Sequence, residues 1–219
     1  MKRFQMPSHL FVCVVDGQHI FLDLVRDRYF RLPPTEDAAF AALAEGRSDG
    51  MAASSLEPLI RAGVLVHHPE GKPIASTAYP LPDASLAETA DSGRPARLID
   101  VAEVATLVLA ARRTVRRKAL PRAFSKLSNV RADRSGRARR RDDLVRRFVA
   151  ARRLIPVAPN CLYDSLALRR YLARRDVAAD LVIGVKLHPF GAHCWLQEGA
   201  TVLNDALGGA SGFKPVLVA

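Results

Sequence analysis

The sequence is short of cysteine, of long apolar runs and of acidic residues, and each shortage narrows the classes of protein it can belong to. Its 219 residues include three cysteines, Cys13, Cys161 and Cys194. A small, odd number of thiols argues against a disulfide framework and fits a reducing compartment. It also leaves room for one thiol with a special chemical role.

No apolar run approaches the roughly 20 residues that a membrane-spanning helix needs. The most apolar helical candidate, residues 101–111, contains Glu103. The apolar run at residues 10–15 stops at Asp16, and no small-residue cleavage site follows it. We therefore expect a soluble, cytoplasmic protein with no membrane partner.

Acidic residues are scarcest in one segment of the chain. The formal net charge is +11, and residues 112–153 alone hold 17 Arg and Lys against three acids. Two interpretations stay open for this basic segment. It either presents solvated helical faces or binds a polyanion or an acidic partner.

The first third of the chain predicts a small sheet. Three short strands are expected at residues 8–15, 19–24 and 28–32. Asp16-Gly17 separates the first two, and an Asp-Gly pair between apolar runs is a strong hairpin signal. Pro33-Pro34 then ends the sheet.

Two helices and one more strand are expected after that sheet. Thr35 can cap a helix at residues 36–44, and Ser54-Ser55 can cap a second helix that ends at Gly63. A short strand follows at residues 64–66. The predicted order is β-β-β-α-α-β, which describes a winged-helix-like domain at residues 1–70.

A stretch rich in Pro, Ser, Ala and Gly, residues 71–95, is the predicted linker to a second domain at residues 96–219. In that domain we expect a helix from about residue 96, a mobile basic loop at 131–141 and a basic helix at 142–154. A helix at 161–174 and strands at 180–186, 192–197 and 201–204 complete it.

Cys161 is the candidate nucleophile. Asn160 is a good N-cap, so the thiol lies in the first turn of the helix that follows. Unpaired backbone N–H groups and the positive end of the helix dipole both favour the thiolate there. The Cys161 N–H is in addition a candidate oxyanion donor.

His193 and Asp205 are the candidate base and its orienting acid. On a strand, His193 shares a face with Trp195 and Gln197, while Cys194 points the other way. A tight turn at residues 198–200 folds the next strand back, which brings residues 204–205 roughly opposite His193. Asp205 then orients the imidazole, or Asn204 does if the register shifts by one.

Structural roles compete with these functional ones. A lone cysteine is usually a small buried hydrophobe, and a lone strand histidine is usually structural. A zinc site at Cys161, His188, His193 and Cys194 is disfavoured, because adjacent strand residues point to opposite faces and neither CxxC nor HExxH is present. We expect neither a metal nor another cofactor.

The pattern of Cys161 on its helix, residues 191–195 and residues 202–205 resembles the transglutaminase-like "B" proteins of lasso-peptide biosynthesis. The resemblance implies a cysteine peptidase that removes the leader from a ribosomally made precursor peptide. It also implies a partner cyclase that closes the macrolactam ring. Cys194 departs from the family pattern, where a small residue is more usual.

Residues 21–32 are similar to the peptide chaperone of pyrroloquinoline quinone biosynthesis. The similarity implies that a leader adds as a strand to the third strand, beside the last helix. The implied peptide-binding residues are Arg28, Tyr29, Phe30, Arg31, Leu32, Leu56, Leu59 and Ile60. For Phe30 and Leu32, filling the core of the small domain is the competing role.

Together these features predict an α+β protein with an N-terminal winged-helix-like peptide-recognition domain and a C-terminal papain/transglutaminase-like cysteine peptidase domain. Its partners would be the precursor peptide and the cyclase. Two alternatives remain. One is a winged-helix nucleic-acid-binding protein, which explains the charge but not Cys161, His193 and Asp205. The other is an acyltransferase, or transglutaminase, that uses the same three residues.

Overall fold

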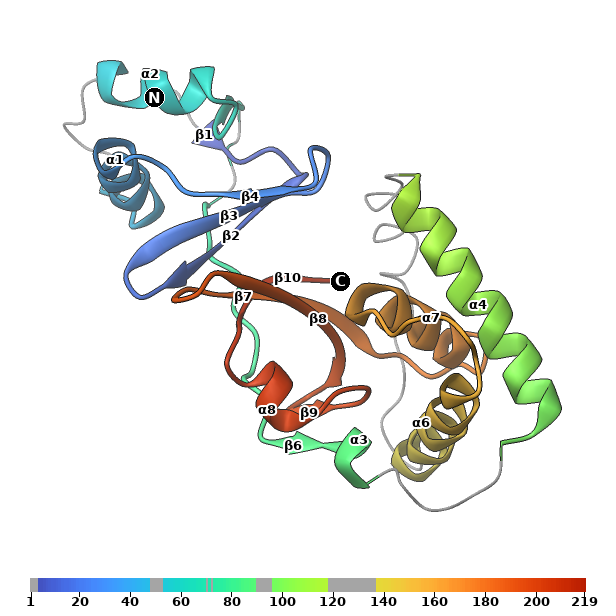
Figure 1. Ribbon diagram of the computed structural model, residues 1–219. Helices are drawn as coiled ribbons and strands as arrows, with labels where there is room; N and C mark the ends of the chain where they lie inside the picture. The colour runs from blue at the N-terminus through green and yellow to red at the C-terminus, as the bar shows by residue number, and fades with distance from the viewer. Residues whose placement is uncertain (1–3, 48–52, 70, 72, 90–95, 118–136) are drawn as a thin grey trace. The chain divides into compact units, whose positions relative to one another are not determined.

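The computed structural model describes residues 4–47, 53–69, 71, 73–89, 96–117 and 137–219 (Figure 1). The chain divides into two compact units, Met1–Ala78 and Tyr79–Ala219. Both contain helices and strands, so the chain has a mixed α+β fold. Within the described residues, no helix combines the length and the apolar character needed to cross a membrane.

The first unit is built on an antiparallel three-stranded sheet in the order β2-β3-β4. Its strands are β2 (Leu10–Val15), β3 (Gln18–Asp23) and β4 (Arg28–Phe30). Asp16 and Gly17, with φ of 49° and 76°, form the hairpin turn, as expected for a two-residue turn that needs positive φ at both positions. A second, two-stranded sheet pairs β1 (Phe4–Gln5) with β5 (Val66–His67).

Two helices cover one face of the sheet, α1 (Pro34–Ala44) and α2 (Ala53–Arg61). Three aromatic rings form the centre of the packing: the Phe21 ring stacks on Phe30 at 5.0 Å and meets Phe40 edge-on at 4.9 Å. Leu59 and Leu65 are fully buried in the same cluster. Such edge-on and offset pairs are the favoured aromatic geometries.

The sequence predicted the three sheet strands to within two residues at each end. Both cap predictions were wrong. Helix α1 begins at Pro34, whose fixed φ suits a first helical position, and no side chain caps it. Ser54 and Ser55 lie inside α2. The strand predicted at residues 64–66 instead covers Val66–His67 (β5), because the side chains of Val64 and Leu65 are buried in the core. The winged-helix likeness stays a prediction.

The second unit contains a five-stranded sheet in the order β10-β7-β8-β9-β6. The strands are β6 (Ala84–Ser85), β7 (Asp180–Lys186), β8 (Gly191–Glu198), β9 (Thr201–Val202) and β10 (Lys214–Val218). All neighbours are antiparallel except β6 and β9. Strand β8 pairs with β7 along its length but with β9 only at two positions.

Helix α7 (Cys161–Ala173) packs against β7 and β8, and α4 (Leu98–Arg116) and α6 (Arg137–Arg153) pack on α7 (Figure 1). Two short helices, α3 (Leu86–Thr89) and α8 (Leu207–Ala210), lie near β9 and β8 respectively. The end of α7 meets the start of α4, where Tyr171 donates to Asp100 and Arg175 pairs with Glu103.

Several expectations for this unit need correction. Residues 137–141 belong to α6 and are not part of a mobile loop, since Arg141 is fixed by ion pairs with Asp142 and Glu198; residues 131–136 lie outside the described residues. Part of the segment expected to be a linker joins the second unit, because β6 pairs with β9. Strand β10 was not predicted. The helix at Cys161 and the strand at residues 180–186 were predicted accurately.

Gly184 is a testable point of this fold. A Cβ at this position would lie 2.7 Å from Trp195 and 2.8 Å from Phe213. We expect Gly184→Ala to lower the free energy of unfolding by about 1–3 kcal/mol, because the core has no room for the methyl group. Urea unfolding measures this, with Gly208→Ala as the control, since no atom lies within 4 Å of a Cβ there. Equal stabilities for the two variants would contradict the packing.

Candidate active site

The first turn of α7 is held in place by side chains on both sides of it. Asn160 Oδ1 accepts from the N–H groups of Leu162 and Tyr163, at 3.1 Å each. Asp164 Oδ2 accepts from the Asn160 N–H at 3.2 Å, and Arg152 donates to Asp164 Oδ1 at 2.7 Å. The predicted N-cap is therefore confirmed, and Cys161 occupies the first helical position.

His193 lies on β8 between two aromatic rings. Its imidazole stacks on Trp195 with ring centroids 6.0 Å apart, and Phe213 contacts it at 5.4 Å. Trp195 is held in turn by its Nε1, which donates to Gln197 Oε1 at 2.8 Å. The alternation that placed His193, Trp195 and Gln197 on one face is confirmed, and these contacts fix the plane of the imidazole.

Asp205 reaches His193 from the bend after β9, not from a paired strand. The ladder with β8 ends at Val202. Asp205 Oδ2 pairs with His193 Nε2, and its Oδ1 accepts from the Ala206 N–H at 2.7 Å. Asn204 points elsewhere: its Oδ1 accepts from the Leu196 N–H at 2.7 Å. Of the two candidates, Asp205 is the residue next to the imidazole.

The structure brings Cys161, His193 and Asp205 together at the start of α7. The Cys161 thiol is hydrogen-bonded to His193. Because Nε2 of His193 is taken by Asp205, Nδ1 is the nitrogen left for the thiol. The side chains of His193 and Asp205 are 20% and 29% exposed. The group is thus partly covered and still reachable by a substrate.

Each member of this group shifts the proton affinity of the next. The hydrogen bond to Asp205, followed by that to Cys161, raises the pKa of His193 to about 9. The hydrogen bond with His193 lowers the pKa of Cys161, against the opposing effect of burial. The N–H groups of Cys194 and Leu162 act in the same direction. At neutral pH the arrangement favours a thiolate–imidazolium pair, the reactive form of a cysteine nucleophile.

The other two cysteines have different surroundings. Cys194 is buried, and this burial raises the pKa of its thiol. Cys13 is buried in the sheet of the first unit. Within the residues that the structure describes, no three His, Cys, Asp or Glu side chains are grouped to hold a metal ion.

The predicted peptide-binding residues fall into two sets in the first unit. Leu56 and Leu59 are buried in its core, and Phe30, Leu32 and Ile60 pack against that core. Arg28, Tyr29 and Arg31 lie at β4, where Arg28 is exposed and its guanidinium lies 5.2 Å from the Phe30 ring. Their contact with a peptide stays a prediction.

Strand β4 is an edge of its sheet. The Leu24 N–H donates to the His9 carbonyl, so the backbone groups of Leu24 and of every second residue before it point toward β2. The backbone groups of the residues between them, Asp23 and Phe21, point toward β4. Their partners Arg28 and Phe30 therefore bond to β3. The same alternation directs the N–H of Arg31 to the outer side of the strand.

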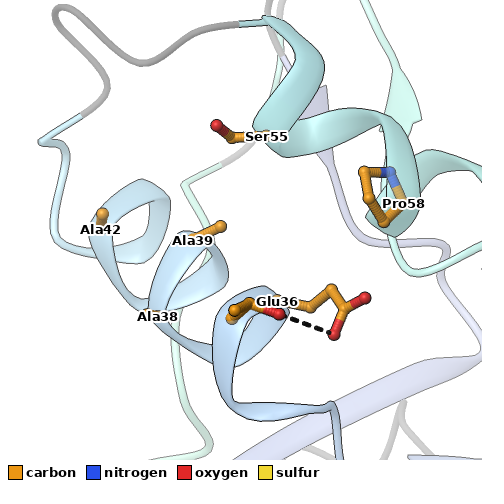
Figure 2. Close-up of a pocket in the computed structure, with 7 residues that line it drawn as sticks. Glu36, Ala38, Ala39, Ala42, Ser55 and Pro58 are labelled. Atoms are coloured by element: carbon orange, nitrogen blue, oxygen red, sulfur yellow. Dashed lines mark hydrogen bonds between the residues drawn. The ribbon is translucent and has the colours of Figure 1, made fainter.

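A hollow of about 380 Å³ lies between α1 and α2 in the first unit (Figure 2). Figure 2 shows small side chains along its wall and the Glu36 carboxylate at one end. It is lined by Thr35, Glu36, Ala38, Ala39, Ala42, Ser55 and Pro58. None of the eight predicted peptide-binding residues lines it.

Sequence reasoning missed Phe213 and Ser165 around the imidazole and the thiol, and it considered Asn204 only as a substitute for Asp205. Phe213 contacts His193, and Ser165 and Asn204 join α7 to β8 through hydrogen bonds. Ser165 had a usable signal, since it follows Cys161 by four residues and so shares its helix face. Phe213 had none, because it comes from a segment whose strand was not predicted.

Comparison with known proteins gives one family and one relative. The family described as the transglutaminase-like superfamily matches residues 104–218. The microcin J25-processing protein McjB of Escherichia coli is 49% identical over 47 residues, which are 22% of this chain and 23% of McjB. The matched segment therefore spans less than a quarter of that relative. No solved structure matches the chain.

The pairing of His193 with Asp205 predicts a pH response. The folded-state pKa of about 9 is raised from 6.5, so the stabilisation from the charged imidazolium is complete below 6.5 and is lost as the pH rises through about 9. In Asp205→Asn the largest cause of the shift is gone, and we expect the His193 pKa to fall toward 6.5. NMR titration of the imidazole measures it.

Asp83→Asn is the control for this experiment, because Asp83 is an exposed acid of the same unit. It should leave the His193 titration unchanged. A His193 pKa that stays near 9 in Asp205→Asn would show that another group holds the proton.

Proposed function

The chain belongs to the transglutaminase-like superfamily, and from this premise we propose that it is a cysteine peptidase that removes the leader from a ribosomally made precursor peptide. Its similarity to McjB suggests a part in the processing of a lasso-type peptide. The observation that carries the proposal is the hydrogen-bonded series Cys161–His193–Asp205 at the start of α7.

In the proposed reaction the Cys161 thiolate attacks the carbonyl carbon of the bond between leader and core. The His193 imidazolium protonates the departing core amine, and a thioester to the leader is left on Cys161. Neutral His193 then takes a proton from water, whose oxygen attacks the thioester. The leader acid departs, Cys161 is released as thiolate, and His193 is again protonated. Asp205 stabilises each imidazolium form.

Two backbone groups support oxyanion stabilisation in this reaction. The first is the Cys194 N–H, which acts on the Cys161 sulfur and helps to lower the pKa of the thiol, whereas the Leu162 N–H already donates to Asn160 Oδ1. The Cys161 N–H itself lies at the start of a helix, where backbone donors lack an intrahelical partner. Preorganised donors of this kind typically contribute about 2.7–4 kcal/mol to acyl-transfer barriers.

The first unit supplies the proposed leader site. Strand β4 offers an edge onto which an extended peptide can add as a further strand. The outward N–H of Arg31 is one of the donors such a peptide would use. Linking this unit to the peptidase unit in one chain raises the effective concentration of the scissile bond at the thiol.

The nucleic-acid alternative rests on the charge of residues 112–153. Three of its 17 Arg and Lys form ion pairs within the protein: Arg141 pairs with Asp142 and Glu198, Arg147 with Asp143, and Arg152 with Asp164. Paired arginines have less to gain from phosphates, and nucleic-acid binding gives no role to Cys161, His193 and Asp205. We therefore favour the peptidase, with an acidic partner such as the cyclase as the proposed use of the remaining arginines.

The central test incubates the protein with the precursor peptide encoded nearby, in the presence of the cyclase and ATP. We expect the wild type to release the leader, and Cys161→Ala to reduce the rate by at least about 10³-fold, because no thiolate is present to attack. Mass spectrometry of the products measures this, with Cys13→Ala as the matched thiol control.

Two outcomes would contradict the proposal in different ways. An intact cognate precursor with the wild-type protein would remove the leader-peptidase function. Products that carry an added amine in place of a free leader acid would assign the same residues to acyl transfer.

The leader site is tested at Arg31. Arg31→Pro removes the outward N–H, which an edge strand tolerates, and we expect leader affinity to fall by about 5–10-fold, the value of one backbone hydrogen bond. Arg31→Ala keeps the N–H and serves as the matched control. Fluorescence anisotropy of a labelled leader peptide measures both. Equal affinities for the two variants would rule out strand addition at this position.

A further inference from the structure

Among the residues that the structure describes, no strand covers the second edge of part of β8. Strand β9 pairs with β8 only at Gln197 and Glu198. The Leu203 N–H donates to the Leu196 carbonyl, so the backbone groups of Leu196, and of Cys194 two residues earlier, face the side on which β9 would have continued. Buried backbone groups of this kind need other partners.

Side chains supply those partners through a continuous chain of hydrogen bonds. The Leu196 N–H donates to Asn204 Oδ1 at 2.7 Å, and Asn204 Nδ2 donates to Ser165 Oγ at 2.8 Å. Ser165 Oγ then donates to the Cys194 carbonyl at 3.2 Å. Ser165 is fully buried.

The two ends of this chain fix its direction. The Leu196 N–H can only donate, so the amide oxygen of Asn204 must face it and the amide nitrogen must face Ser165. The Cys194 carbonyl can only accept, so the Ser165 hydroxyl proton must point to it. One arrangement satisfies every member, and a residue without both a donor and an acceptor at position 165 would break it.

Three of the four members of this chain, Ser165, Cys194 and Asn204, are close neighbours of the proposed catalytic residues. Ser165 lies one turn after Cys161 on the same face of α7. Cys194 follows His193, and Asn204 precedes Asp205. The Cys194 N–H also donates to the Cys161 sulfur. The hydrogen bonds thus join the three segments that carry the thiol, the imidazole and the carboxylate.

We propose that Ser165 and Asn204 are positioning residues, which hold the start of α7 and the bend after β9 against the uncovered edge of β8 so that His193 reaches Cys161 and Asp205 at once. The proposal deepens the proposed function and rests on it for its catalytic meaning. The distance between the thiol and the imidazole, which these residues would set, does not depend on any substrate.

Removal of either side chain leaves buried polar groups without partners. Ser165→Ala leaves the Cys194 carbonyl and one Asn204 N–H without a hydrogen-bond partner. Asn204→Ala leaves the Leu196 N–H without one. Water or a local shift must then satisfy them, and the segments move apart. The Cys161–His193 hydrogen bond, the largest cause of the lowered thiol pKa, weakens as a result.

The experiment measures the thiolate of Cys161 directly, by its ultraviolet absorbance and by its rate of alkylation with iodoacetamide across pH. Cys161→Ala provides the background from Cys13 and Cys194. In Ser165→Ala and Asn204→Ala we expect the thiol pKa to rise toward the ordinary value of about 8.5, so that alkylation near pH 6 slows about tenfold for each unit by which the pKa comes to exceed 6.

Three further variants separate positioning from general stability. Ser165→Thr keeps the hydroxyl and should restore most of the wild-type titration. The double variant should shift the pKa no further than the larger single change, because both act on one chain of hydrogen bonds. Tyr79→Phe removes a 2.6 Å hydrogen bond to Asp180 in the same unit and should lower the melting temperature without moving the thiol titration.

The proposal is overturned if Ser165→Ala and Asn204→Ala fold and titrate as the wild type does, or if Tyr79→Phe shifts the thiol as much as they do. If the buried Ser165→Ala does not fold, the half-buried Asn204→Ala carries the same test. No precursor is needed, so an intact precursor would remove the leader-peptidase function while the titrations still decide the role of Ser165 and Asn204.

Discussion

The second unit depends on how the N-terminal turn of α7 meets the part of β8 that β9 leaves uncovered. A helix start has N–H groups without partners, and an open strand edge has both N–H and carbonyl groups without partners. In this unit the unpaired groups of the helix start and those of the strand edge lie next to each other. Ser165 and Asn204 satisfy the strand, Asn160 caps the helix, and the Cys194 N–H is left for the Cys161 sulfur. A fully paired β8 would have satisfied its own edge and left the thiol without that donor.

The parts of this site that the sequence predicted are those set by local rules. An N-cap needs only the residues that follow it, so Asn160 and the start of α7 were predicted correctly. Alternation along a strand needs only β8, so the shared face of His193 and Trp195 was correct as well. Asp205 was chosen from an assumed ladder; the structure brings it to His193, but from a bend.

The parts that the sequence did not predict depend on contacts between distant segments. Strand β6 is two residues long and is held by β9, more than a hundred residues away. Phe213 reaches the imidazole from the residue just before β10, the strand that pairs with β7. Arg141 was predicted to lie in a mobile loop, but an ion pair with Glu198, far along the chain, holds its side chain in place. No local propensity carries such information, because the partner sets the conformation.

Solvent access bears on which of the two acyl-transfer outcomes the site supports. A thioester on Cys161 partitions between water and any amine that reaches it, and transfer to an amine requires that water be kept away. His193 and Asp205 are both partly exposed, at 20% and 29% of their side-chain surface, although Trp195 and Phe213 cover part of the imidazole. Bulk water, at a far higher concentration than any amine, then reaches the thioester beside a histidine able to deprotonate it. In the proposed reaction this exposure favours hydrolysis over transfer.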